Sequence, residues 1–278
     1  MKTFEIANAK INLYLDVSRK REDGYHDVTT LMHQISLCDE LWIEAHESER
    51  TLIKLKVDGG GDDIPCDHRN LVYKAAELFL KRLGKSMNVE IHLLKNIPSM
   101  AGLGGGSSDA AATLRGLNRL LGFPFDDAVL ETFAAELGSD TAFFIRNITA
   151  LCSGRGEILT PFTSDLEGHL VLVEGKEPSS TKTAFSKIDE LEKGIRKSPD
   201  FDHFSYSDVF NIFEEVISES CPSVKMHLAQ LKQFDPLCVA MSGSGSAVFA
   251  IFETKDAAEF VAKKMTKCGS TAHVCSLL

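Results

Sequence analysis

The sequence predicts an α+β fold in two domains, and three of its features support that class. The first third alternates apolar and polar residues as half-buried strands do, most clearly at residues 53–57. A glycine-rich segment at residues 102–106 then joins an expected strand to an expected helix. After residue 153 a second series of strands and helices begins. We therefore expect an N-terminal domain at residues 1–155 and a C-terminal domain at residues 156–278.

The first domain is expected to begin with strands and to end with helices. Its expected strands lie at residues 4–17, 28–37, 41–46, 52–57 and 88–94. Its expected helices lie at residues 70–84, 107–121 and 126–138. Asn70 and Asp126 suit the N-caps of the first and third helices, and Gly84, Gly122 and Gly138 suit the positions just after the three helices.

The second domain repeats strands and helices after the turn-like "SGRGE". We expect strands at residues 168–174, 237–241, 247–252 and 272–277. We expect helices at residues 181–194 and 256–265, and two more across residues 207–234.

Composition is that of an ordinary globular chain. The 278 residues are 44% hydrophobic and 25% charged, and 30 basic against 40 acidic residues give a formal charge of −10. This charge disfavours binding to nucleic acid or to an anionic membrane. We find neither an N-terminal apolar leader nor a membrane-spanning run, so we expect a cytoplasmic protein, either a monomer or a weak homodimer.

The cysteines predict neither disulfides nor a structural metal. There are seven, an odd number without a C-x-x-C pair, which favours reduced thiols. Cys66 and His68 lie close together, but a second ligand pair at the spacing of a zinc finger is absent.

The segment "PSMAGLGGGSSDAAA" predicts a phosphate site. Bare backbone at a strand-to-helix junction presents unpaired N–H groups at the positive end of a helix dipole. Ser107 and Ser108 add hydroxyl groups, and Asp109 could hold a cation. A flexible turn is the simpler interpretation, but each glycine costs about 0.5–1 kcal/mol relative to alanine. Neither the Walker A motif nor the dinucleotide G-x-G-x-x-G motif fits, since Ser107 follows Gly106.

Two charged residues are candidates for catalysis. Lys10 interrupts an apolar strand, where alternation places it on the same face as Asn12. Asp140 precedes the apolar "TAFFI". Spacing alone leaves several roles open for this carboxylate: a helix cap, a partner for a lysine, or a catalytic base.

At these residues the chain resembles the GHMP kinases, the family of galactokinase, homoserine kinase and mevalonate kinase. The resemblance covers "AKINLYLDV", "REDGYHDVTTLM", "RNLVYKAAELF", the glycine-rich segment, "ELGSDTAFFI", "GRGEILTPF", "STKTAF" and "MSGSGSAVF", in that order. It implies an N-terminal nucleotide-binding domain like domain 2 of ribosomal protein S5 and a ferredoxin-like C-terminal α/β domain.

The resemblance also implies an ATP-dependent small-molecule kinase that works with Mg²⁺. Asp140 would accept the proton of the attacking hydroxyl, with Lys10 beside it. The residues implied to bind ATP are Asn70, Lys95, Gly102, Leu103, Gly104, Gly105, Gly106, Ser107 and Ser108. No protein ligand is assigned to the metal, although Ser108 or Asp109 could contact it.

The implied second substrate is a cytidine diphosphate-linked methylerythritol, a precursor of isoprenoids. Tyr25 and Phe185 would stack on the two faces of its cytosine ring, and His26 would bond to the polar edge. The other residues implied to contact it are Asn12, Gly243, Ser244 and Gly245. A homoserine or mevalonate type of kinase, and a non-catalytic nucleotide-binding regulator, are the alternatives.

The chain departs from the family pattern at three positions. Ala142 and Ser246 stand where proline is usual, which we expect to loosen the backbone there. Ile212 stands where an aspartate is usual.

Overall fold

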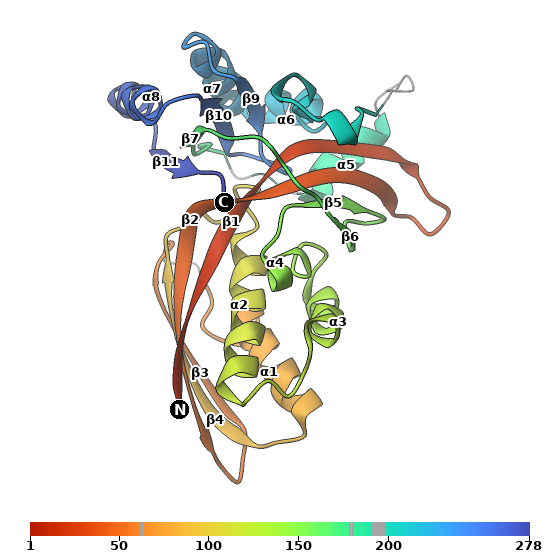
Figure 1. Cartoon of the computed structure of the whole chain (residues 1–278), viewed down its shortest axis with the longest axis vertical. Helices are drawn as coiled ribbons and strands as arrows, with labels where there is room; N and C mark the ends of the chain where they lie inside the picture. The colour runs from red at the N-terminus through yellow and green to blue at the C-terminus, as the bar shows by residue number, and fades with distance from the viewer. Residues whose placement is uncertain (62–63, 178, 180, 191–197) are drawn as a thin grey trace. The chain divides into compact units, whose positions relative to one another are not determined.

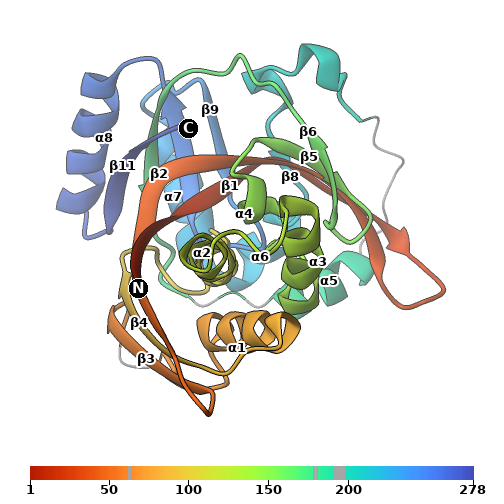
Figure 2. The same ribbon diagram turned by 60° about the horizontal axis from the view of Figure 1, so that its bottom comes forward.

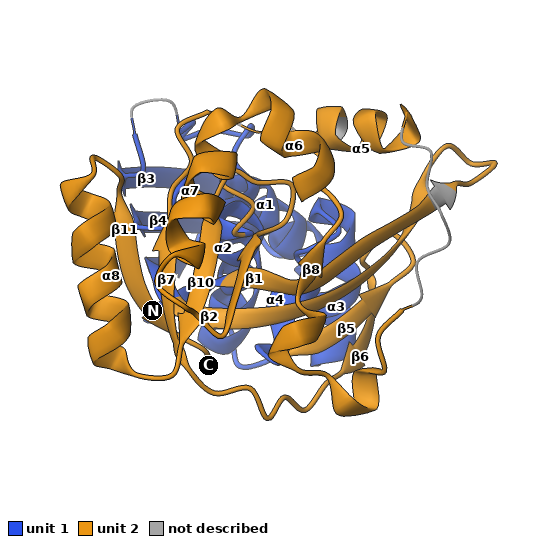
Figure 3. Ribbon diagram, turned by 90° about the horizontal axis from the view of Figure 1, so that it is seen from above, with its two compact units in different colours: residues 1–9, 37–99, 104–148 blue, residues 10–36, 100–103, 149–278 orange. Residues whose placement is uncertain are grey.

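The computed structural model describes residues 1–61, 64–177, 179, 181–190 and 198–278. Two compact units make up the chain (Figure 3). Unit 1 contains residues 1–9, 37–99 and 104–148, and unit 2 contains residues 10–36, 100–103 and 149–278. Neither unit is continuous in sequence, so this division differs in kind from the expected domains 1–155 and 156–278, which stay a prediction.

Two long strands run through both units. They are β1 (Lys2–Lys20) and β2 (His26–Glu47), and they form the longest ribbons in Figure 1. In unit 1, β4 (Met87–Lys95) pairs in antiparallel fashion with β2 and in parallel fashion with β3 (Leu52–Gly59).

Helices α1 (Leu71–Leu83), α2 (Gly105–Leu120) and α3 (Asp127–Leu137) pack against one another in unit 1 (Figure 2). The short α4 (Phe143–Arg146) follows α3. The predicted caps of α1 and α3 are confirmed, because the side chains of Asn70 and Asp126 accept bonds from Val72 N and Val129 N.

Unit 2 contains a four-stranded antiparallel sheet in the order β11-β7-β10-β9. Its strands are β7 (His169–Val173), β9 (Cys238–Met241), β10 (Val248–Phe252) and β11 (Ala272–Ser276). The helices of this unit are α5 (Thr181–Glu190), α6 (Glu214–Ser220), α7 (Pro222–Lys232) and α8 (Lys255–Lys267). Val171, Val248, Val261 and Met265 are buried between this sheet and its helices. Two single turns of 3₁₀ helix, Phe201–His203 and Tyr206–Asp208, precede α6.

The remaining strands of unit 2 are short. A hairpin of β5 (Ala150–Ser153) and β6 (Ile158–Pro161) pairs with β2 through β5, and β8 (Phe210–Asn211) pairs in parallel with β1. Among the described residues, no helix is both long and apolar enough to cross a lipid bilayer.

The α+β fold class is confirmed, and three details of the sequence prediction are wrong. The expected strands 28–37 and 41–46 are one strand, β2, because Asp39 is buried and satisfied by tertiary contacts described below. Helix α2 begins at Gly105 rather than Ser107, since Gly104 takes the left-handed conformation and ends the preceding loop. The β5–β6 hairpin and β8 were not expected, because strands of two to four residues are too short to show a period. The expected end of helix 181–194 lies outside the described residues.

Candidate active site

Lys10 is buried in unit 2 and held by two acceptors. Only 3% of the residue is exposed, and its Nζ donates to Asn12 Oδ1 at 2.5 Å and to Gly102 O at 2.8 Å. Asn12 in turn donates to Thr30 Oγ1 at 2.7 Å. The prediction that Lys10 and Asn12 share one face of the strand is confirmed. The ammonium group therefore has a fixed position beside the first glycine of the glycine-rich segment.

The late motif "MSGSGSAVF" lies against the same glycine. Ser242 Oγ donates to Gly102 O at 3.0 Å, and Ala247 N donates to Ala101 O at 3.1 Å. Gly102 has φ +79°, and a Cβ built on it would lie 2.1 Å from Ser242 O. A Cβ on Gly243 would lie 3.2 Å from Lys10 Nζ. Only a bare backbone allows these segments to approach so closely.

Ser244 connects this motif to the start of α5. Its Oγ lies 2.8 Å from Thr181 Oγ1, and its carbonyl accepts a bond from Ser179 Oγ. Gly245 packs closely on Met241, whose Sδ would lie 2.7 Å from an added Cβ. The residues predicted to contact the second substrate, Gly243 to Gly245, thus lie between Lys10 and α5.

The second half of the glycine-rich segment starts α2 in unit 1. Gly106 is exposed, and a Cβ on Gly105 would meet Ile97 at 3.0 Å and Lys95 Nζ at 3.1 Å. Ser108 is fully buried, and its Oγ has no hydrogen-bond partner among the described residues. This first helical turn combines backbone N–H groups with an unsatisfied buried hydroxyl, which suits an anion or its counter-ion.

Asp140 lies in the same unit as this helical turn. It is half-buried and follows Gly138, where an added Cβ would lie 3.9 Å from Ser107 Oγ. Thr141 N donates to Gly138 O at 3.1 Å and closes the turn that carries Asp140. The chain around Asp140 therefore runs beside the serine of the predicted phosphate site. Lys10 belongs to unit 2, so the pairing of Lys10 with Asp140 stays a prediction.

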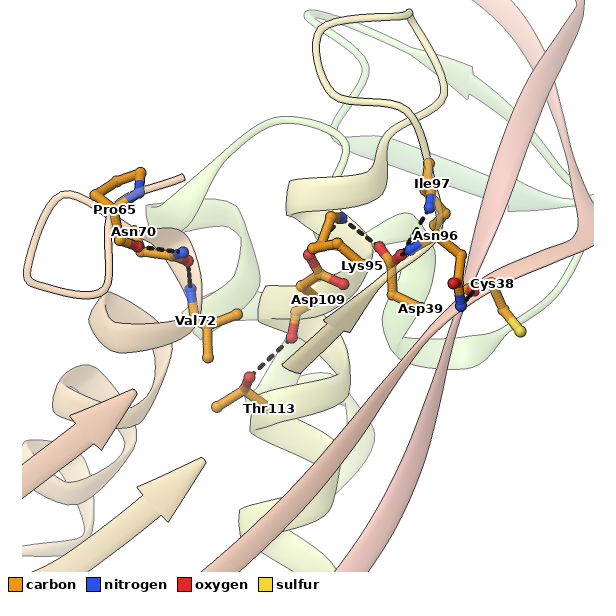
Figure 4. A network of polar contacts seen from close by, with 10 residues as sticks. All are labelled: Cys38, Asp39, Pro65, Asn70, Val72, Lys95, Asn96, Ile97, Asp109 and Thr113. Carbon is orange, nitrogen blue, oxygen red and sulfur yellow. Dashed lines mark hydrogen bonds and ion pairs between the residues drawn. The ribbon is translucent and has the colours of Figure 1, made fainter. Parts of the chain in front are cut away.

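Lys95 is buried between two carboxylates (Figure 4). Its Nζ bonds to Asp39 Oδ2 and lies 2.8 Å from Asp109 Oδ2. Asp39 also accepts bonds from Asn96 N at 2.6 Å and Ile97 N at 2.8 Å. The ammonium group that the resemblance implies to bind ATP is thus committed to an internal ion-pair network. Asp109 is committed to the same network, although its Oδ1 is buried without a partner among the described residues.

Burial and the neighbouring charges shift the pKa values of Lys95 and Asp109 in opposite directions. Burial raises the pKa of Asp109 well above its ordinary range, and the attraction of Lys95 only partly opposes this. Burial alone would lower the pKa of Lys95, but the charges of Asp109 and Asp39 raise it. Lys95 is therefore a permanent cation beneath the first turn of α2.

Asn70 serves as the N-cap of α1. Its Oδ1 accepts from Val72 N at 2.9 Å, and its Nδ2 donates to Pro65 O at 2.8 Å (Figure 4). Both ends of the amide are used by the fold, so the predicted role of Asn70 toward ATP rests on the resemblance alone.

His26 and Phe185 are brought together in unit 2, and the ring of Tyr25 contacts Arg155. The imidazole of His26 stacks on Phe185, with ring centroids 5.2 Å apart and 30° between planes. Tyr25 is 54% exposed, and the guanidinium of Arg155 lies 4.9 Å from its ring centroid. The predicted placement of a base between Tyr25 and Phe185 stays a prediction.

Two polar residues support the site and were missed from the sequence. Asn211 is buried, and its Nδ2 donates to Met241 O at 2.7 Å and to Gly243 O at 2.8 Å, which holds the late glycine motif. Asp39 anchors Lys95. Each residue gave only a local signal, a polar side chain beside apolar ones, and this does not reveal a distant partner.

The positions that depart from the family pattern are accommodated in the core. Ile212 packs in the hydrophobic cluster of unit 2, and Ala142 is buried at the start of α4. Ser246 is buried and donates to Glu177 O at 2.7 Å, so the loosening expected there has a compensating bond. The effect of these residues on the rate stays a prediction.

Two buried oxygen atoms, Ser108 Oγ and Asp109 Oδ1, are the candidates to contact a metal ion. Across the part of the chain that the structure describes, no group of three or more His, Cys, Asp or Glu side chains is placed to hold a metal. Ser108 Oγ and Asp109 Oδ1 are buried oxygen atoms without partners in that part, and Mg²⁺ prefers oxygen ligands.

Sequence comparison gives matches to two models of one family. "GHMP kinases N terminal domain" matches residues 70–147, and "GHMP kinases C terminal" matches residues 182–271. Together they include the glycine-rich segment, Asp140, Phe185 and the late glycine motif.

Curated relatives match over most of their length. Proteins named 4-diphosphocytidyl-2-C-methyl-D-erythritol kinase are similar to this chain in Methylacidiphilum infernorum and Bacillus subtilis. The first is 42% identical, with 90% of this chain and 86% of the relative covered. The second is 38% identical, with 91% and 89% covered.

Two solved structures of kinases are also similar to this chain. A crystal structure of 4-(cytidine 5'-diphospho)-2C-methyl-D-erythritol kinase is 31% identical, covers 99% of both chains and has a TM-score of 0.83. A homoserine kinase from Cytophaga hutchinsonii has a TM-score of 0.75 at 19% identity, which is a likeness of fold.

Proposed function

This chain belongs to the GHMP kinase family, and from that premise we propose that it phosphorylates 4-diphosphocytidyl-2-C-methyl-D-erythritol with ATP. The acceptor is the 2-hydroxyl group, and the product feeds the non-mevalonate route to isoprenoids. The observation that carries this proposal is the pair of relatives of that name, which are 42% and 38% identical over about nine-tenths of the chain.

The reaction is the transfer of the γ-phosphoryl group. The 2-hydroxyl oxygen forms a bond to the γ-phosphorus, the bond from this phosphorus to the β,γ-bridging oxygen breaks, and ADP leaves. Asp140 takes the proton of the hydroxyl, and Lys10 stabilises the attacking oxygen. The fixed position of the Lys10 ammonium, bonded to Asn12 and Gly102, supports its role.

Binding of ATP is assigned to the glycine-rich segment and the first turn of α2. Backbone N–H groups there and the hydroxyl groups of Ser107 and Ser108 offset the charge of the phosphates. Mg²⁺, when bound with ATP, neutralises part of that charge. Ser108 is the better candidate to hold it, because Lys95 already engages Asp109.

Recognition of the second substrate is assigned to Asn12, Tyr25, His26, Phe185 and the late glycine motif. The stacked pair of His26 and Phe185 supports an aromatic site for a base. The cytoplasmic location and the monomeric or weakly dimeric state expected from the sequence stay predictions.

The test is ADP release by the purified protein with ATP and magnesium. The cytidylyl substrate, homoserine and mevalonate are compared at equal concentration. We expect release with the first alone. Release with homoserine or mevalonate would favour another small-molecule kinase. ATP binding without release in any of the three reactions would favour a nucleotide-binding regulator.

A further inference from the structure

One helix holds the imidazole of His26 on two sides. Helix α5 carries Phe185 and Asp189, which are four positions apart and so lie on one helical face. Phe185 stacks on the ring of His26, and Asp189 Oδ1 lies 2.6 Å from His26 Nε2. The side chain of His26 is only 6% exposed. The orientation of the ring is therefore fixed by contacts with the protein.

The charge of Asp189 decides which nitrogen carries the proton. The carboxyl group of Asp189 has an ordinary pKa of 3.8 and is ionised at neutral pH, so it can only accept a hydrogen bond, and the contact with His26 lowers its pKa further. Lys20 Nζ lies 3.4 Å from the other oxygen, Oδ2, and favours the same ionised form. His26 Nε2 must then carry the hydrogen and donate a hydrogen bond to the carboxylate.

Nδ1 of His26 has no hydrogen-bond partner among the described residues. In a neutral imidazole whose Nε2 carries the hydrogen, Nδ1 presents a lone pair and accepts.

We propose that Asp189 is a positioning residue that fixes the proton of His26 on Nε2, so that Nδ1 selects a base with an exocyclic amino group. This inference rests on the proposed function, because it explains how a cytidylyl substrate is preferred. Cytosine presents an amino donor where uracil presents a carbonyl acceptor. Nδ1 accepts a hydrogen bond from the amino group of cytosine. Toward uracil it faces a carbonyl oxygen, which is also an acceptor, so a uridylyl analogue is rejected.

The first experiment needs no ligand and no turnover. Protein with ¹⁵N-labelled histidine is studied by NMR above the pH range in which imidazole titrates, and the His26 signals are identified from a His26→Gln variant. In the wild type we expect the Nε2–H tautomer alone. In Asp189→Ala we expect a mixture of the two tautomers, and an unchanged signal would overturn the proposal.

The second experiment measures base selection by calorimetry with cytidine diphosphate and uridine diphosphate as probes. We expect Asp189→Ala to weaken the binding of cytidine diphosphate about tenfold, which corresponds to the loss of one hydrogen bond. The affinity for uridine diphosphate should stay nearly unchanged. Asp189→Asn retains an acceptor oxygen at the same position, so it should restore part of the preference. An unchanged ratio of the two affinities in Asp189→Ala would contradict the proposal.

Asp200→Ala is the matched control. It removes another histidine–carboxylate pair of unit 2, in which His203 Nδ1 lies 3.0 Å from Asp200 Oδ2 and both side chains are exposed. We expect no effect on either probe. Loss of the proposed function would appear as a wild type that does not phosphorylate the cytidylyl substrate. Failure of the inference would appear as an active wild type whose selectivity and His26 tautomer are unaffected by Asp189→Ala.

Discussion

Lys95 Nζ lies 2.8 Å from Asp109 Oδ2 and is also bonded to Asp39, so one ammonium serves two buried carboxylates. Asp109 lies in the first turn of α2, and Lys95 is the last residue of β4. The network therefore ties the start of the phosphate-binding helix to the sheet of unit 1.

Lys95→Met is expected to destabilise the protein by about 3–5 kcal/mol, because it leaves two carboxylates buried without a cation. Denaturant unfolding gives the free energy. Lys54→Met is the control, since Lys54 pairs with Glu90 on the surface at 2.7 Å. That change should cost less than about 1 kcal/mol. Equal losses of unfolding free energy in the two variants would show that the buried network adds no stability.

Gly102→Ala is expected to lower kcat/KM for ATP by at least about tenfold, because an added Cβ would lie 2.1 Å from Ser242 O and displace the loop. Gly122→Ala isolates this clash from backbone strain. Gly122 has φ +80°, close to the +79° of Gly102, but an added Cβ would meet nothing within 4 Å. Steady-state kinetics and thermal unfolding of both variants make the comparison. Similar kinetic losses in the two would assign the effect to strain alone.

Tyr25→Ala is expected to raise KM for the cytidylyl substrate about tenfold or more, and KM for ATP far less, because stacking on a base contributes about 1–3 kcal/mol. Phe123→Ala is the control, since Phe123 is likewise an exposed aromatic residue, in unit 1. Equal increases of KM for both substrates would place Tyr25 outside the base site.

His227 makes stability depend on pH. It is fully buried in α7, with Nε2 3.0 Å from Ser270 Oγ, and burial lowers its pKa from the ordinary value of 6.5. The unfolded chain therefore takes up this proton first. The contribution of His227 to stability is complete above about pH 6.5 and is lost as the pH falls toward the folded-state pKa.

Denaturant unfolding across this pH range measures the loss. In His227→Gln, the decrease of unfolding free energy below about pH 6.5 should be smaller than in the wild type. The surface variant His46→Gln should follow the wild-type curve. A His227→Gln curve parallel to the wild type would assign the pH dependence to other groups. His33 is one such group, since its pKa is also lowered by burial.

Local sequence signals predict the helices well and the long strand β2 poorly. Helix α1 was predictable because its cap, its apolar period and its terminal glycine lie within one short segment. The continuity of β2 was not, because Asp39 is satisfied by Asn96, Ile97 and Lys95, more than 50 positions away. A carboxylate in an apolar segment indicates a strand end unless such distant partners are known.

The candidate site shows the same limit. The glycine-rich segment carries its chemistry in consecutive residues, so the sequence predicts an anion site there. The contact of Gly102 with Ser242 joins positions 140 apart, and that of His26 with Asp189 joins positions 163 apart. Resemblance indicated the first of these motifs, and the structure alone indicates Asp189.

The most direct test of the central claim compares wild type with Asp140→Asn. ADP release with the cytidylyl substrate and binding of ATP are measured on the same preparations. The account predicts that the variant loses at least about a hundredfold in kcat, the usual contribution of a general base, while its affinity for ATP is nearly unchanged. A variant that turns over near the wild-type rate would contradict the assignment of Asp140 as the base. A wild type that releases no ADP with this substrate would contradict the function itself.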